Sequence, residues 1–236
     1  MTRILATKDS AEDIFIKIER KKRVYSQILN LLEGKEGLSL LDVGCSTGNF
    51  LLSCKREGFQ PVVGIEICKT RATFAARLGL TVFNCQLEEA TLPDRSFDII
   101  TYLETLEHIS TPVNELREAY RILRNGGIIV VEVPNVTFQL LKAKVSRLLH
   151  IGHYGLIPDI HLVHFTERTI KTALAKAGFV SIETTLRTHY LREKLPIHIK
   201  VLSILLHYFA KFVRSISGLN IGSAIITVAE KVDLSP

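Results

Sequence analysis

Short apolar runs alternate with amphipathic segments along much of the chain. The apolar runs have the length and composition of buried strands, and they lie at 38–43, 61–65, 80–84, 97–102 and 127–133. Apolar residues at helical spacing fill the segments at 49–57, 69–78 and 112–123. Strands separated by helices in this way predict a parallel sheet with right-handed connections.

Further regular elements are expected on both sides of this alternation. Helical spacing runs through 11–32 and stops at Gly34 and Gly37. After Pro134 we expect a basic, helix-like insertion at 137–150 and then a loop that reaches His164. The remaining expected elements are a helix capped by Thr166 that runs to Ala177 and ends at Gly178, a strand at 179–186, a helical stretch at 187–217 and a last strand at 223–231.

Charge and cysteine usage narrow the class of protein. The four cysteines show no CxxC pairing, and the first residues lack the apolar stretch of a secretory signal, so we expect a cytoplasmic protein. The net charge is +6, but apart from a cluster at 20–23 the basic residues are spread along the chain with few aromatics between them. No nucleic-acid partner is therefore expected.

The stretch LLDVGCSTGNF at 40–50 carries the clearest chemical signal. It joins a strand to a helix, which is where open α/β sheets bind ligands. A dinucleotide site needs GxGxxG, yet here Gly44 and Gly48 flank Ser46 at the middle position. The carboxylate of Asp42 favours a cationic ligand. The turn therefore suits S-adenosylmethionine, a sulfonium without phosphates, better than NAD.

A second carboxylate, Glu66, ends the next strand within VVGIEI. Its position close to 20 residues after the glycine turn is where a carboxylate can accept hydrogen bonds from both hydroxyls of a ribose. A solvated glutamate at a strand end is the structural alternative for Glu66 alone. Together with the glycine turn, Glu66 supports a nucleoside ligand.

These motifs resemble the class I S-adenosylmethionine-dependent methyltransferases, in particular the subgroup similar to ubiquinone and menaquinone biosynthesis methyltransferases. The likeness runs from about Leu40 to Asn135 and is carried by LLDVGCSTGNF, VVGIEI, EEATLPDRSFDIITYLETLEHI and ELREAYRILRNGGIIVVEVPN. The resemblance implies a doubly wound, Rossmann-like α/β fold with helices on both faces of a mostly parallel seven-stranded sheet, whose last strand is antiparallel.

The resemblance also implies a set of cofactor-binding residues. It assigns Asp42, Gly44, Cys45 and Gly48 to the methionine end of S-adenosylmethionine, Glu66 to the ribose with Ile67 beside it, Gln86 and Leu87 to the adenine, and Leu103 to the floor of the site. Gln86 departs from the subgroup, which usually has an aspartate there, although glutamine keeps an acceptor oxygen. The product would be S-adenosylhomocysteine.

We expect one domain for the whole chain, because 236 residues suit a single α/β domain with an insertion. Its expected parts are an N-terminal helical region (1–37), the cofactor-binding core (38–135), an insertion or lid (136–165) and the second half of the sheet with an amphipathic helix (166–236).

Candidate catalytic residues follow the fourth predicted strand in YLETLEHI. Glu104, Glu107 and His108 stand at i, i+3 and i+4 and face one way if the segment is helical. They would then deprotonate an acceptor or hold a divalent cation. Alternatively, Glu107 and His108 only shape the turn. Methyl transfer itself needs positioning more than a dedicated base.

The loop before the predicted helix at 166 supplies candidate substrate contacts, Tyr154 and His161, near the expected mouth of the site. His161 and His164 have the look of a spaced metal pair. Structural histidines in a lid explain them better, because no cysteine or third ligand has the spacing of a closed zinc site. No metal site is expected.

Two stretches, 138–151 and 197–216, mix leucine, isoleucine and phenylalanine with basic residues. These stretches are either helices that pack on the sheet or form a subunit contact, or helices that make a peripheral membrane contact. A membrane contact would favour a lipidic acceptor. We therefore expect methyl transfer to a small-molecule or lipid-like acceptor. The alternatives are a binding protein of the same fold without transfer and an NAD-dependent oxidoreductase.

Overall fold

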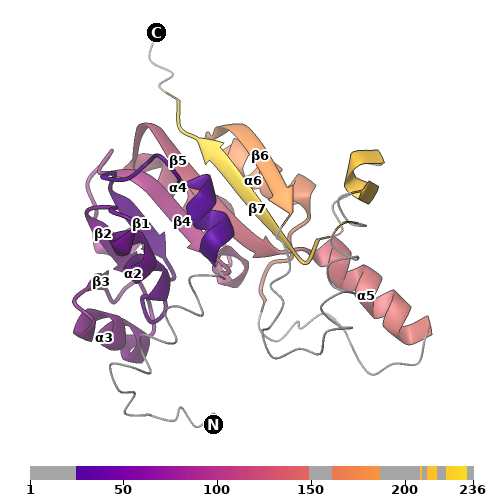
Figure 1. The fold of residues 1–236 in the computed structure, drawn as a ribbon, viewed down its shortest axis with the longest axis horizontal. Coiled ribbons are helices and arrows are strands. Elements are labelled where there is room, and N and C mark those ends of the chain that lie inside the picture. The colour runs from indigo at the N-terminus through magenta and orange to yellow at the C-terminus, as the bar shows by residue number, and fades with distance from the viewer. Residues whose placement is uncertain (1–24, 149–160, 187–207, 209–211, 217–221, 233–236) are drawn as a thin grey trace.

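The computed structural model describes residues 25–148, 161–186, 208, 212–216 and 222–232. Seven strands form one sheet in the order β3-β2-β1-β4-β5-β7-β6 (Figure 1). They are β1 (Leu40–Val43), β2 (Val62–Ile65), β3 (Thr81–Phe83), β4 (Phe97–Leu103), β5 (Leu123–Pro134), β6 (Val180–Leu186) and β7 (Ala224–Glu230). β7 is antiparallel to β5 and β6, whereas the other neighbouring pairs are parallel. The expected fold class is confirmed, including the antiparallel last strand.

Helices connect the strands. They are α2 (Asn49–Arg56), α3 (Lys69–Arg77), α4 (Pro112–Ile122), α5 (Val136–Leu148) and α6 (Glu167–Ala177), with short 3-10 turns η1 (Glu88–Ala90) and η2 (Leu106–His108). Residues 25–31 and 212–216 are also helical. The expected order of strands and helices is therefore confirmed within the described ranges.

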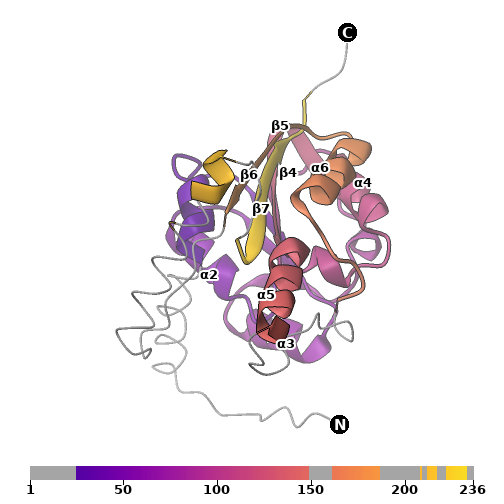
Figure 2. The same ribbon diagram turned by 90° about the vertical axis from the view of Figure 1, so that its right-hand side faces the viewer.

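Alternation along the strands divides the interior into two cores. Leu41 and Val43 of β1 face a core that includes the buried sides of α4 and α6. Leu40 faces the other core, with α2 and the helix at 25–31. Successive side chains of a strand point to opposite faces, so a short run of apolar residues builds both cores. Figure 2 shows helices on both sides of the sheet.

The ends of α6 form as the sequence predicts. The Thr166 hydroxyl accepts a hydrogen bond of 3.2 Å from the Thr169 backbone N–H. Gly178 ends the helix with a φ of 107°, a left-handed conformation that favours glycine. One boundary differs, because β5 begins at Leu123 rather than at Gly127. The cause is that Leu123 already pairs with Phe97 of β4.

The insertion after β5 contains α5, which confirms the helix expected there. α5 runs away from the end of the sheet in Figure 1. Most of the helix expected at 11–32, the loop that carries Tyr154, and most of the stretch at 187–217 lie outside the described residues. Within the described residues, every helix is too short or too polar to cross a membrane.

Candidate functional site

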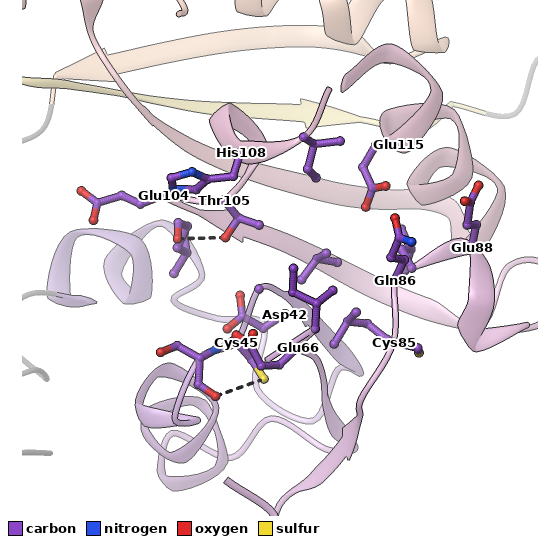
Figure 3. A pocket seen from close by; sticks show the side chains of 18 of the residues that line it. Asp42, Cys45, Glu66, Cys85, Gln86, Glu88, Glu104, Thr105, His108 and Glu115 are labelled. Atoms are coloured by element: carbon purple, nitrogen blue, oxygen red, sulfur yellow. Dashed lines mark hydrogen bonds between the residues drawn. The ribbon is translucent and has the colours of Figure 1, made fainter. Parts of the chain in front are cut away.

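A cleft of about 1080 Å³ opens at the carboxyl ends of β1, β2 and β4. Figure 3 shows Glu104 and His108 toward one end of it, Gln86, Glu88 and Glu115 toward the other, and Asp42 between them. Most of the residues that the sequence assigned to the cofactor line this cleft, namely Asp42, Gly44, Cys45, Glu66, Ile67, Gln86, Leu87 and Leu103. One parallel edge of the sheet therefore brings together residues that lie far apart in the sequence.

The turn after β1 depends on Gly44. Its φ is 79°, and a Cβ atom at this position would lie 2.3 Å from the Thr105 side-chain oxygen. Only glycine avoids both the left-handed strain and this clash. Gly44 thereby lets the β1 turn pack directly against the turn that follows β4.

Backbone N–H groups of the β1 turn are already hydrogen-bonded within the protein. The N–H groups of Gly44 and Cys45 both donate to the Ile65 carbonyl, at 2.8 and 3.0 Å. The Gly48 N–H donates to the Cys45 carbonyl at 2.9 Å, and the Ser46 N–H donates to the Glu66 carboxylate at 2.9 Å. These donors are therefore committed, whereas a phosphate site presents such donors to its ligand.

Asp42 is the buried carboxylate at the centre of the site. It lies 3% exposed at the end of β1 and accepts a 2.7 Å hydrogen bond from the Thr101 hydroxyl of β4. Burial raises the pKa of Asp42 to about 7, although the hydrogen bond from Thr101 lowers it, and the nearby charge of Glu66 raises it further. A cationic ligand would favour the ionised form of Asp42 and stabilise it.

Glu66 is held rigidly at the end of β2. One of its carboxylate oxygens accepts a hydrogen bond from the Ser46 N–H at 2.9 Å and the other from the Cys68 N–H at 2.7 Å. A carboxylate oxygen has a second lone pair, so each oxygen can still accept a bond from a ligand. The glycine turn and the residue that precedes α3 therefore orient one carboxylate that lines the cleft.

The predicted adenine end is built on the segment between β3 and β4. The Asn84 side chain donates to the backbone carbonyls of Glu66 and Ile67, at 2.8 and 3.0 Å, and so ties this segment to the end of β2. Leu87 is buried, and Ile67 is 72% exposed beside the cleft. The Gln86 N–H donates to Glu89, and the Gln86 side chain stands at the cleft wall in Figure 3.

Two residues of the glycine turn have structural features that the motif alone does not reveal. Gly48 does not line the cleft, and a Cβ atom there would lie 2.3 Å from a Leu80 methyl group. Gly48 therefore packs against Leu80 and Ala75 and not against the cleft. Burial raises the pKa of the Cys45 thiol, and the charges of Asp42 and Glu66 raise it further. This thiol is neutral, which excludes it as a nucleophile near neutral pH.

The segment YLETLEHI does not form the helix on which one shared face depended. Glu104 has a φ of 53° and precedes η2, which contains Glu107 and His108. Glu104 and His108 line the cleft, whereas Glu107 is only 2% exposed and lies behind them. Burial raises the pKa of Glu107 to about 7. A hydrogen bond from its own backbone lowers this pKa, whereas the charges of Glu104 and Glu132 raise it further.

His161 approaches this group from a distant part of the chain. Its ring centroid lies 5.2 Å from that of His108 and 6.0 Å from that of His164. The backbone N–H groups of Leu162 and Val163 both donate to the Glu107 carbonyl, at 2.9 and 3.0 Å. Spacing in the sequence does not reveal this approach, so the Glu107–His108 pair and the His161–His164 pair are treated separately in the sequence analysis.

The fold and this site define a class of protein. Residues 17–184 match a family described as a methyltransferase domain. The chain belongs to this family, as the sequence motifs indicated.

Two curated relatives narrow the likeness. A malonyl-[acyl-carrier protein] O-methyltransferase of Geobacter sulfurreducens is 32% identical over 172 residues, which are 69% of this chain and 64% of the relative. A ubiquinone biosynthesis O-methyltransferase of Caulobacter vibrioides is 35% identical over 113 residues, which are 45% of this chain and 44% of the relative. The chain thus spans less than two thirds of the length of these relatives. The likeness to the ubiquinone subgroup is confirmed.

Solved structures agree on the fold. A SAM-dependent methyltransferase from Archaeoglobus fulgidus superposes with a TM-score of 0.64 at 19% identity, over 94% of this chain and 100% of that one. At this identity the likeness concerns the fold alone.

Proposed function

We propose that the chain transfers a methyl group from S-adenosylmethionine to a small-molecule or lipid-like acceptor, and that the cleft binds the donor. Family membership supports this reaction. The observation that carries it is the state of the turn after β1. Its backbone donors at Gly44, Cys45, Ser46 and Gly48 are committed within the protein, and carboxylates stand beside it.

The same observation disfavours NAD. A pyrophosphate requires free N–H donors or cations, and the carboxylates of Asp42, Glu66 and Glu104 would repel it. A sulfonium with an ammonium group is attracted by these carboxylates instead. S-Adenosylmethionine supplies a methyl group that is already activated, so the protein need not generate one.

This chain's own residues would act by binding and orientation. Asp42 would attract the cationic end of the donor, and Glu66 would accept hydrogen bonds from its ribose hydroxyls. Gln86 and Leu87 would contact the adenine. Positioning an acceptor in line with the methyl group supplies much of the acceleration of such a transfer.

Glu104 and His108 are the candidate groups to receive an acceptor proton, and both line the cleft. The O-methyltransferase relatives support an oxygen acceptor. An oxygen acceptor must lose a proton on methylation, either to one of these side chains as a general base or because a cation held there lowers the pKa of the acceptor. Tyr154 and His161 remain candidate contacts to the acceptor.

A lipid-like acceptor is supported by the exposed side of α5. Leu140, Leu141 and Leu148 are exposed, and so are Lys144 and Arg147 on the same helix. At 100° per residue these five positions fall on one face of the helix. Leucine mixed with basic residues fits the surface of an anionic membrane.

Transfer is tested with S-adenosylmethionine labelled in its methyl group. We expect label to enter hydroxylated aromatic acceptors or acyl-carrier-bound acids, and to be lost in Asp42→Ala and Glu66→Ala. If the donor binds but no acceptor from a cell extract takes up label, the chain is instead a binding protein of this fold. If NAD binds and the methyl donor does not, the chain is an oxidoreductase.

Membrane contact is tested by sedimentation with vesicles of phosphatidylglycerol and of phosphatidylcholine. We expect binding to the anionic vesicles that is weakened by Lys144→Glu together with Arg147→Glu. Lys176→Glu, an exposed charge on α6, is the matched control. Equal sedimentation of all three proteins would contradict the proposal.

A further inference from the structure

We infer that Glu107, His108 and His161 form a binding site for a divalent transition-metal cation at the edge of the cleft. A carboxylate oxygen of Glu107 and one ring nitrogen of each histidine lie within 4.8 Å of one another. Three ligand atoms at such distances can close on one ion with small side-chain rotations. The inference extends the proposed function, and the reaction step given for it rests on that function.

Backbone hydrogen bonds hold the two halves of this site together. Glu107 and His108 belong to η2, whereas His161 lies far along the chain, in the segment that precedes α6. The Glu107 carbonyl accepts hydrogen bonds from Leu162 and Val163, the two residues after His161. The same segment is fixed at its other end by a bridge between Phe165 and Asn135. The ligands are therefore positioned by main chain and do not depend on a chance side-chain approach.

Glu107 provides the observation that points to a ligand. Its side chain is buried, and its Oε2 atom has no hydrogen-bond partner within the part of the chain that the structure describes. A buried carboxylate oxygen without a partner is costly, and native proteins rarely leave one. A cation between Glu107 and the two imidazoles would satisfy it.

The donor set indicates the kind of cation. Two imidazole nitrogens and one carboxylate oxygen are a set that binds Zn²⁺ in catalytic sites, which leave a further position open. Oxygen-only sets suit Mg²⁺ and Ca²⁺ better. His108 is exposed and lines the cleft, so the open position would be accessible to an acceptor.

The cation would prepare the acceptor for transfer. A hydroxyl bound to it has a lowered pKa and releases its proton to solvent. The acceptor oxygen then attacks the methyl carbon of the donor, and the carbon–sulfur bond breaks with its electron pair on sulfur. The products are the methyl ether, S-adenosylhomocysteine and one proton.

The test is a titration of chelator-treated full-length protein with Co²⁺, followed by visible absorption, and with Zn²⁺, followed by calorimetry. We expect one equivalent of either ion to bind to the wild type. His161→Ala and Glu107→Gln should each weaken binding by about tenfold or more. His164→Ala is the matched control, since His164 touches His161 but lies outside the three ligands.

Binding of S-adenosylhomocysteine to the same samples shows that each variant is folded. Equal affinity of wild type, His161→Ala and Glu107→Gln for the ions, or no binding to the wild type, would overturn the inference. The proposed function stands if S-adenosylhomocysteine binds in that case, and fails independently if it does not.

Discussion

The hydroxyl of Thr101 donates a hydrogen bond of 2.7 Å to the carboxylate of Asp42, across the parallel pair of β1 and β4 in which these two residues are directly opposite. Both residues are buried. Thr101 therefore stabilises the ionised form of the carboxylate that we place against the cationic end of the donor.

Removal of the Thr101 hydroxyl should lower the affinity for the methyl donor without changing the size of the site, because valine and threonine have similar volumes. In Thr101→Val the pKa of Asp42 should rise further, because the hydrogen bond that lowers it is lost. We expect the affinity for S-adenosylmethionine at pH 7 to fall by about tenfold, in line with a hydrogen bond to a charged group of about 1.5 kcal/mol. Calorimetric titration measures this, and Thr101→Ser should retain most of the affinity.

Donor binding should be coupled to a proton. The pKa of Asp42 is raised to about 7 in the free protein, and a cationic donor should lower it, so binding releases a proton near neutral pH. The affinity should therefore increase as pH rises from 6 to about 8. Calorimetry in two buffers of different ionisation enthalpy detects the release, and a pH-independent affinity without release would contradict it.

Stability of the free protein should respond to the same group with the opposite sign. A carboxyl whose folded pKa is raised contributes stability that is lost as pH rises from about 4 through about 7. At pH 8 the free energy of unfolding of Asp42→Asn should therefore exceed that of the wild type, by about 4 kcal/mol at most. At pH 4 we expect the two proteins to differ little in denaturant titrations.

Gly44 offers a matched comparison. Gly44→Ala places a methyl group 2.3 Å from Thr105 at a φ of 79°, whereas Gly79→Ala has a φ of 76° and meets nothing within 4 Å. Both substitutions incur the left-handed strain of about 1 kcal/mol. Only Gly44→Ala should also displace the turn and abolish donor binding. Equal donor affinity of the two variants would contradict the role of Gly44.

Much of the fold could be predicted from local pattern, because strands and helices follow apolar periodicity and glycine turns. The cap at Thr166, the stop at Gly178 and the antiparallel last strand are examples, the last through the family resemblance. The cofactor residues could also be predicted from the sequence, because Asp42 and Glu66 lie at the ends of neighbouring strands and the sheet brings them together.

Contacts between distant segments could not be predicted. The N–H groups of Leu162 and Val163 donate hydrogen bonds to the Glu107 carbonyl, and these bonds hold His161 beside His108. Gly48 shows the reverse case. Its motif indicated a ligand contact, but its position is determined by close packing on Leu80, and its contact to the cofactor stays a prediction.

Calorimetric titration of the full-length protein with S-adenosylmethionine and S-adenosylhomocysteine tests the central claim most directly. The account predicts that both bind with one equivalent, and that Asp42→Ala and Glu66→Ala each lose most of the heat. If folded wild-type protein gives no heat with either compound, the cleft is not a methyl-donor site and the account is wrong.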